Sequence, residues 1–349
     1  MLGFCLPSFN KWTVNDIPFL LKMYGRDPFD SDGRLIEAQL GILLESDDGL
    51  LVMIDALGNY NSYEITGARH YLFNHGLRNI IESENNADIM RKIVDFTQDE
   101  NPNTRHDAYD ILAKVTQTAI TNNGYRGYFD YYPTIINSIR DTDKNIRINS
   151  IYWLSELPEA GGFIAPTMRD ILHDNNETDR FYASCVLARI DPAYHEPIPI
   201  LIDALGNSDE WISSLAASSL IFYGSDASDA LPILMDLMEK SDHWGIRDYA
   251  KTISEIGPGD GSIIPRLTEL AANSPADLRE TAIEILGNFG AGAESALPAL
   301  RARLEPSTEK NPAIRTTLRA AIQKIEDGIE SKGQSDTSEA VIQGDENNE

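Results

Sequence analysis

The sequence has few cysteines and no long apolar run. Its two cysteines, Cys5 and Cys185, provide neither a disulfide framework nor the paired spacing of a metal site. This usage is typical of the reducing cytoplasm, which is the expected location. No apolar stretch approaches the roughly 20 residues of a membrane-spanning helix, and the N-terminus lacks the basic and apolar regions of a secretory signal. We therefore expect no association with a membrane.

Basic residues are also scarce. The 349 residues include 55 Asp and Glu against 29 Lys and Arg, which gives a formal net charge of −26. Binding of DNA or RNA depends on Lys and Arg side chains that neutralise phosphates, so the composition argues against a nucleic-acid partner. Electrostatic complementarity instead favours a protein partner that carries a basic patch.

Motifs that bind metals or cofactors or carry catalysis are missing as well. The six histidines show no consistent metal-ligand spacing. The sequence contains no His-Glu-x-x-His, no Cys-x-x-Cys, no phosphate loop and no Gly-x-Ser-x-Gly elbow. We therefore predict a protein that is not an enzyme and that holds neither a metal nor a cofactor.

What the sequence does contain is an internal repeat marked by proline. Each proline is followed by apolar residues at helical spacing, as in the segment 199–205. Because proline suits the first turn of a helix, each one is predicted to begin a first helix, helix A. The prolines recur every 33 residues and are Pro133, Pro166, Pro199, Pro232, Pro265 and Pro298.

Further positions recur at fixed offsets from these prolines, or from the aligned residue in degenerate repeats. A turn-forming Asp or Asn stands at offset +8, a small residue at +17, and Leu or Ile at +21. The sequence therefore predicts a second helix, helix B, from about +13, and polar contacts between successive repeats through +8 and +14. Two repeats depart from the pattern, because Ser213 replaces arginine and Arg247 comes one residue late. Arginine occupies +14 as Arg105, Arg147, Arg180 and Arg279.

This pattern resembles the HEAT-repeat family. It is carried by Asp141…Ile146-Arg147…Leu154 and by Asn273…Leu278-Arg279…Ala282…Leu286. The resemblance implies an all-α fold, a right-handed α-solenoid of about nine helix pairs starting near 18, 51, 91, 133, 166, 199, 232, 265 and 298. Degenerate repeats are expected in 1–132 and regular repeats in 133–327. The acidic, apolar-poor tail 328–349 is predicted to be disordered.

The first candidate surface for a partner is the aromatic loop 122–132, which interrupts the repeat. Tyr and Arg dominate the energetics of many interfaces, so this loop could contact a partner. The alternative is that its aromatic side chains pack beneath the neighbouring repeat, and the sequence leaves both open. The candidate residues are Tyr125, Arg126, Tyr128 and Phe129.

The second candidate surface is the face formed by the B helices, which the HEAT resemblance places on a concave side. Trp211 and Trp244 occupy the same offset in successive repeats, where they could contact a partner or cap the apolar seam of the stack. The residues expected on this face are Tyr152, Phe181, Tyr182, Trp211, Phe222, Trp244 and Arg247.

Together these features predict a non-catalytic scaffold or adaptor that binds a protein, with an immunity-type inhibitor of a basic toxin or nuclease as one specific form. Extended concave surfaces are what stacked repeats offer to partners. The alternative follows from the resemblance, because some HEAT-like proteins act as bilin lyases or as DNA alkyl-base glycosylases. A lyase-type function would need a pigment-sized cavity, whereas the net charge argues against the glycosylase.

Overall fold

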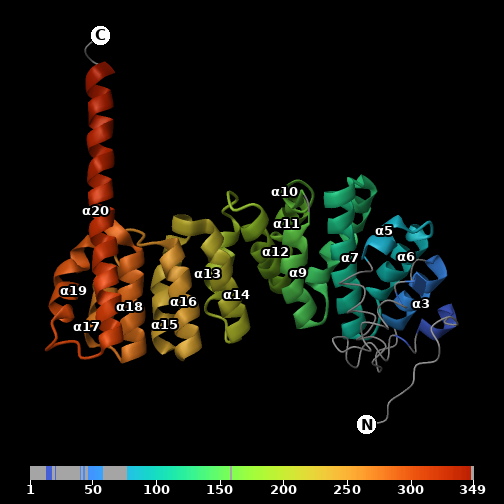
Figure 1. The fold of residues 1–349 in the computed structure, drawn as a ribbon, viewed down its shortest axis with the longest axis horizontal. Coiled ribbons are helices and arrows are strands. Elements are labelled where there is room, and N and C mark those ends of the chain that lie inside the picture. Colours follow the sequence, from blue (N-terminus) through green and yellow to red (C-terminus); the bar gives the residue numbers. More distant parts are fainter. Residues whose placement is uncertain are drawn as a thin grey trace. The chain divides into compact units, whose positions relative to one another are not determined.

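The computed structural model describes residues 13–17, 20, 40, 42–43, 46–57, 77–157 and 159–346. Within these residues the secondary structure consists of α-helices and short 3-10 helices, without strands (Figure 1). The chain forms two compact units, Met1–Val186 and Leu187–Glu349, and the division falls inside helix α12 (Glu177–Ile190). It therefore lies within the region predicted to hold the regular repeats. The predicted repeat near residue 18 falls largely outside the described residues.

In the N-terminal unit, consecutive helices pack against each other in pairs. Helix α6 packs on α7, the short α8 and η4 pack on α9, and α7 also packs on α9 of the next pair. The elements are η1 (Val14–Asp16), α3 (Asp47–Leu57), α5 (Leu77–Glu82), α6 (Asn86–Phe96), α7 (Pro102–Asn123), η3 (Arg126–Tyr131), α8 (Tyr132–Ile136), η4 (Asn137–Arg140), α9 (Lys144–Glu156), α10 (Ala160–Phe163) and α11 (Ala165–Ile171).

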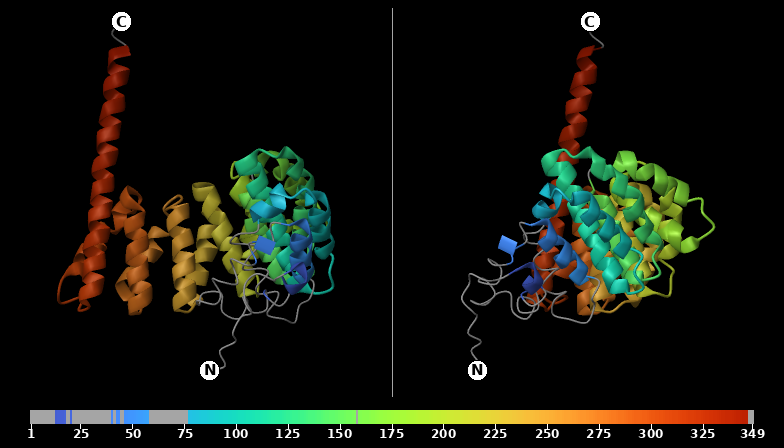
Figure 2. Two further views of the ribbon diagram at one scale, coloured as in Figure 1. Left: turned by 45° about the vertical axis from the view of Figure 1, so that its right-hand side comes forward. Right: turned by 90° about the vertical axis from the view of Figure 1, so that its right-hand side faces the viewer.

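In the C-terminal unit the pairs are more regular, and they follow one another in chain order (Figure 2). The second helices of successive pairs, α14, α16, α18 and α20, pack in a row and create a continuous core. The elements are α13 (Pro197–Ala204), α14 (Glu210–Leu220), η5 (Ile221–Ala230), α15 (Leu231–Lys240), α16 (His243–Ile256), α17 (Ile264–Asn273), α18 (Ala276–Asn288), η6 (Gly290–Ala296), α19 (Leu297–Leu304) and α20 (Pro312–Glu346).

The repeating prolines lie where the sequence places them. Each of the six stands in the first turn of its helix A, which is α8, α11, α13, α15, α17 or α19. The all-α class and the sequential helix pairs are thereby confirmed, while the hand and the number of repeats stay predictions. The residues at +21 fill the seam and are fully buried: Leu154, Leu187, Leu220, Ile253 and Leu286.

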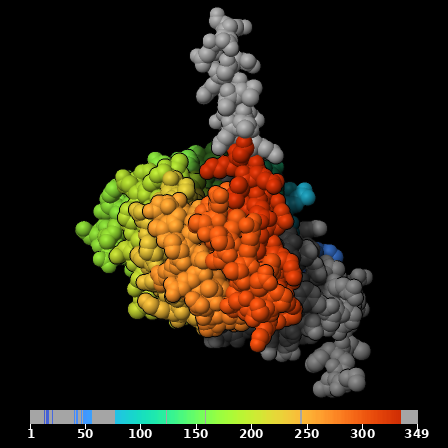
Figure 3. Space-filling model, turned by 90° about the vertical axis from the view of Figure 1, so that its left-hand side faces the viewer, coloured from blue at the N-terminus to red at the C-terminus, as the bar shows by residue number. Residues whose placement is uncertain are grey.

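Helix α20 continues from Pro312 to Glu346 and runs through most of the segment whose composition predicts disorder (Figure 1). Gly328, where composition suggests the tail begins, packs closely against the preceding repeat. A Cβ at this position would come within 2.6 Å of the backbone nitrogen of Ala291. The glycine is therefore needed for the close packing of α20 on the preceding repeat. Figure 3 shows the last helices of this unit packed into one continuous surface.

No helix among the described residues is both long and apolar enough to cross a membrane. Cys185, which its offset on helix B suggests could be exposed, is instead fully buried in α12. Its burial removes it from any role that needs contact with solvent.

Candidate protein-binding surfaces

The aromatic loop begins at a glycine that ends helix α7. Gly124 holds the left-handed conformation with φ of 67°, and its N–H donates to the carbonyl of Ile120 at 3.1 Å. The N–H of Tyr125 donates to the carbonyl of Ala119 at 3.1 Å, which completes the usual left-handed helix end. This turn directs the chain away from α7 and into the 3-10 helix η3.

The inner part of the loop is an anchor. Tyr128 is only 8% exposed, and its hydroxyl accepts a hydrogen bond from Asn86 Nδ2 at 2.7 Å. Tyr132 is buried as well, and loss of hydration raises the pKa of both phenols. The prediction that Tyr128 contacts a partner is corrected, because this side chain packs inward and ties the loop to the repeat before it.

The outer part of the loop and the neighbouring helix α10 provide what we call the aromatic surface: Tyr125, Arg126 and Phe129 from the loop, and Phe163 from α10. Tyr125 is 49% exposed and Phe163 is 48% exposed. Phe163, from α10, stacks on the half-buried Phe129 with ring centroids 4.3 Å apart. Phe163 is the residue that sequence reasoning missed, and an aromatic after two glycines in a connector was the available signal.

The arginine of this surface is held in place by its neighbours. The guanidinium of Arg126 lies 5.8 Å from the centre of the Phe129 ring, and Nη1 lies 3.2 Å from Glu159 Oε1. Glu159 itself adopts φ of 55°, a conformation that costs a non-glycine residue about 1 kcal/mol. Both side chains are well exposed, so the pair can be reached from solvent.

The residues predicted on the B-helix face do not all lie on the surface. Phe181 and Tyr182 are buried, and the guanidinium of Arg147 lies 5.5 Å from the Tyr182 ring centre. Their assignment to a partner is corrected, because neighbouring elements cover most of each B helix and leave a narrow exposed strip. The side chain of Trp244 lies outside the described part of the structure. The exposed members are Tyr152, Trp211, Phe222 and Arg247.

The arginines at +14, here called the turn arginines, hold the turn between helices A and B. Arg105 donates to the carbonyls of Asp99 and Glu100 in its own turn, at 2.9 and 3.1 Å. It also binds the Asp141 carboxylate of the next repeat with two hydrogen bonds, of 2.7 and 2.9 Å. This confirms the predicted contact between +14 and +8 for this pair of repeats.

The other turn arginines repeat the contact with their own turn. Arg147 donates to the carbonyl of Asp141 at 2.7 Å, and Arg180 donates to that of Asp174 at 2.8 Å. Arg279 donates to the carbonyl of Ser274 at 2.7 Å, and its Nε lies 3.0 Å from Glu309 Oε2 of the following repeat. In these repeats the predicted contact between the arginine at +14 and the residue at +8 of the next repeat is therefore less regular.

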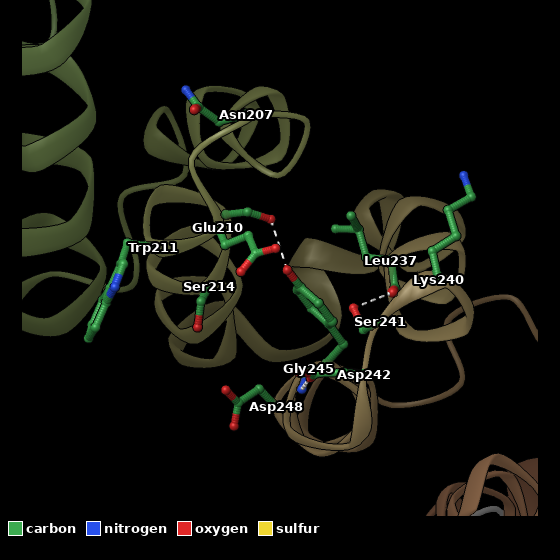
Figure 4. A pocket seen from close by; sticks show the side chains of 12 residues that line it. Asn207, Glu210, Trp211, Ser214, Leu237, Lys240, Ser241, Asp242, Gly245 and Asp248 are labelled. Atoms are coloured by element: carbon green, nitrogen blue, oxygen red, sulfur yellow. Dashed lines mark hydrogen bonds between the residues drawn. The ribbon is translucent and has the colours of Figure 1, made fainter.

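A cleft of about 560 Å³ lies where the turn arginine is missing, and we call it the Ser213 cleft (Figure 4). The Ser213 hydroxyl donates to the carbonyl of Leu205 at 2.9 Å and lies 3.1 Å from the Tyr249 hydroxyl. Tyr249 stands at +17, the offset of the small residues Ser150, Ala183, Ala216 and Ala282 in other repeats. The rim includes Trp211, which is 67% exposed, and the acidic residues Glu210, Asp242 and Asp248.

Within the described residues, no group of three or more His, Cys, Asp or Glu side chains is arranged to hold a metal ion. The described surfaces present exposed aromatic rings, a guanidinium, and carboxylates around a cleft.

Comparison with known proteins places these repeats in a recognised class. Residues 165–254 match the family model described as HEAT repeats. No curated protein matches the sequence.

Solved structures are similar in fold at low sequence identity. The structure of Escherichia coli YibA is 17% identical and has a TM-score of 0.54, covering 85% of this chain and 97% of YibA. An engineered protein is 15% identical with a TM-score of 0.45, covering 90% of this chain and 92% of its own. Kap95p, solved in a study of its binding to RanGDP, is 15% identical with a TM-score of 0.46, covering 89% of this chain and 40% of Kap95p.

Proposed function

We propose that this chain, which matches the HEAT-repeat model over residues 165–254, acts by binding another protein, without catalysis of its own, as a scaffold or adaptor. HEAT-repeat proteins commonly mediate protein–protein interactions, since stacked helix pairs offer extended surfaces to a partner. The aromatic surface is the main contact in this proposal.

One observation carries the proposal: two large aromatic side chains, Tyr125 and Phe163, are about half exposed, and Phe163 stacks on Phe129, beside which the Arg126 guanidinium lies. Aromatic residues and arginine are enriched among the residues that contribute most to binding. The buried Tyr128 and the stacked Phe129 fix the surface beforehand, so little conformational entropy is lost on binding.

The net charge supports a partner with a basic patch. A chain with a formal charge of −26 attracts a basic protein and repels an acidic one over distances of about 8 Å at physiological salt. An inhibitor that covers the active surface of a basic toxin or nuclease is one form of this proposal. We expect capture of the partner to weaken as the salt concentration rises.

The test compares two pairs of substitutions. Tyr125→Ala with Phe163→Ala removes the exposed rings of the aromatic surface. Tyr152→Ala with Phe222→Ala removes comparably exposed rings elsewhere. We expect a protein captured from the native source to bind the first double variant about 30-fold or more weakly in calorimetry with purified components, a loss typical of interface hot spots. The second pair should bind as the unmodified protein does.

Two outcomes would contradict the proposal. If the first double variant retains full affinity while the second loses it, the contact involves Tyr152 or Phe222 and not the aromatic surface. If only a chromophore copurifies, the lyase-type alternative gains support. The Ser213 cleft has the volume of a small-molecule site. Its acidic rim, however, would repel the carboxylates of a tetrapyrrole, which is why we favour a protein partner.

A further inference from the structure

The turn arginines show what a guanidinium site between two repeats looks like in this fold. The guanidinium of Arg105 meets two carbonyls of its own turn, from Asp99 and Glu100. On the next repeat it meets the Asp141 carboxylate and, at 3.1 Å, the Thr142 hydroxyl. A planar group with five N–H donors is satisfied by oxygen acceptors from both turns at once.

Two consecutive repeats lack this arginine. In the repeat of Pro199 the +14 position is Ser213, and in the repeat of Pro232 it is Ile246. Arg247, one position later, is exposed rather than folded under the turn. The Ser213 cleft lies between the turns of these two repeats.

The cleft is lined from the same repeat offsets that surround Arg105 in its own repeat. Arg105 contacts residues at +8 and +9 of its own turn and at +8 and +9 of the next. The Ser213 cleft is lined by Asn207, at +8 of its own turn, and by Lys240 and Ser241, at +8 and +9 of the next. The turn offsets that hold the guanidinium of Arg105 are thus offsets that also line this cleft.

The charge of the cleft suits a cation. Glu210, Asp242 and Asp248 line it, against a single base, Lys240. Asp242 Oδ1 accepts a hydrogen bond from the Gly245 N–H at 3.1 Å, so Glu210 and Asp248 are the carboxylates that face solvent. In Figure 4 the amine of Lys240 points away from Glu210 and Asp248. The exposed Trp211 at the rim offers an aromatic face of the kind on which guanidinium groups stack.

We propose that the Ser213 cleft binds an arginine side chain of the protein partner, whose guanidinium takes the place of the missing turn arginine. A lysine fits less well, because its compact ammonium cannot reach acceptors on both turns at once. The inference rests on the proposed function only in taking the ligand to be a protein, and it concerns a different surface from Tyr125 and Phe163.

The first experiment titrates the full chain with the tripeptide acetyl-Gly-Arg-Gly-amide and follows binding by calorimetry. The matched probes are the citrulline peptide, which keeps the shape without the charge, the lysine peptide, and free agmatine. We expect the arginine peptide to bind about tenfold more tightly than either other peptide, the usual difference for a charged hydrogen-bonding group. Equal binding of the three peptides, no binding of the arginine peptide, or binding of agmatine alone would overturn the proposal.

The second experiment changes the cleft. Ser213→Arg supplies the repeat's own guanidinium and is expected to abolish binding of the arginine peptide. Because this substitution crowds Tyr249, the surface pair Glu210→Gln and Asp248→Asn gives an independent test, with about tenfold weaker binding expected. The pair Asp203→Asn and Asp229→Asn removes the same charge away from the cleft and should leave binding unchanged.

Unchanged affinity in the Glu210→Gln and Asp248→Asn variant, or the same loss in the control pair, would contradict a site in the cleft. These peptide measurements do not involve the natural partner. If the peptides fail to bind the Ser213 cleft, the test of the aromatic surface still stands. If the aromatic surface fails its own test, the peptide experiment on the cleft still stands.

Discussion

Arg105 and Ser213 occupy the same offset, +14, beside the turn between helices A and B of their repeats. The contacts made at this offset differ between the two repeats. In the first, a guanidinium joins two successive repeats through two carbonyls and a carboxylate. In the second, the hydroxyls of Ser213 and Tyr249 lie 3.1 Å apart and join helices α14 and α16 beside a cleft. The contact that joins successive repeats at Arg105 is thus replaced, in the Ser213 repeat, by a different contact beside a polar cleft.

The largest effect expected from this comparison is that of Arg105→Ala. The substitution leaves Asp141, whose side chain is 5% exposed, as a buried carboxylate without its cation. Breaking a buried pair in this way costs about 3–5 kcal/mol of unfolding free energy, measurable by chemical denaturation. The exposed pair of Arg126 and Glu159 is the control, because Arg126→Ala should cost at most about 1 kcal/mol. Equal losses of unfolding free energy in Arg105→Ala and Arg126→Ala would contradict a special role for the buried pair.

The apolar seam should respond the same way whether or not the turn arginine is present. Leu220, in the Ser213 repeat, and Leu154, in the Arg147 repeat, are both fully buried at +21. Changing either to alanine is expected to cost about 2–5 kcal/mol in the same denaturation experiment. A loss near zero for Leu220→Ala would show that the repeat with the cleft lacks a packed seam.

A smaller effect distinguishes the two parts of the aromatic loop. Tyr128→Phe removes the acceptor of the Asn86 hydrogen bond and should cost about 1 kcal/mol of unfolding free energy. Tyr125→Phe, on the exposed part, should change stability within about 0.5 kcal/mol. The reverse order would mean that the outer part of the loop, rather than the inner, anchors it.

The smallest expected effect is a change in the unfolding free energy that is confined to acid pH. Burial raises the pKa of Asp141, but the hydrogen bonds from Arg105 and from the Asp143 N–H outweigh it, so the folded pKa lies below 3.8. The stabilisation by this carboxylate is therefore complete above the unfolded pKa and is lost as pH falls through the folded one. Asp141→Asn should flatten the pH dependence of unfolding in that range. An unchanged slope would contradict the role of this pair.

The repeat and its core could be predicted from the sequence because their signals are local. The proline in the first turn of helix A sets where that helix begins, and the leucine at +21 marks the buried face of helix B. Neither signal depends on residues that are distant in the sequence. Phe181 and Tyr182 could not be placed correctly, because their burial depends on how neighbouring elements cover the helix. The helix through Gly328 was missed for a related reason, since that glycine is required by its close approach to Ala291.

The candidate sites were predicted only in part. The aromatic composition of 122–132 indicated a special loop, but which rings face outward depends on the contacts with Asn86 and Phe163. Ser213 was visible as a departure from the repeat. That a departure leaves a cleft, rather than a collapsed turn, follows from the packing of Tyr249 and could not be read from the residue alone.

The most direct test of the account is to make a second cleft. If the space at Ser213 is a vacated guanidinium site, Arg105→Ala should create another one and should be rescued by a small guanidinium compound. The measurement is thermal unfolding of Arg105→Ala in low millimolar agmatine, with sodium chloride at equal ionic strength as the control. We expect agmatine to raise the Tm of this variant more than that of Arg126→Ala. An equal shift in the two variants, or none, would contradict this expectation.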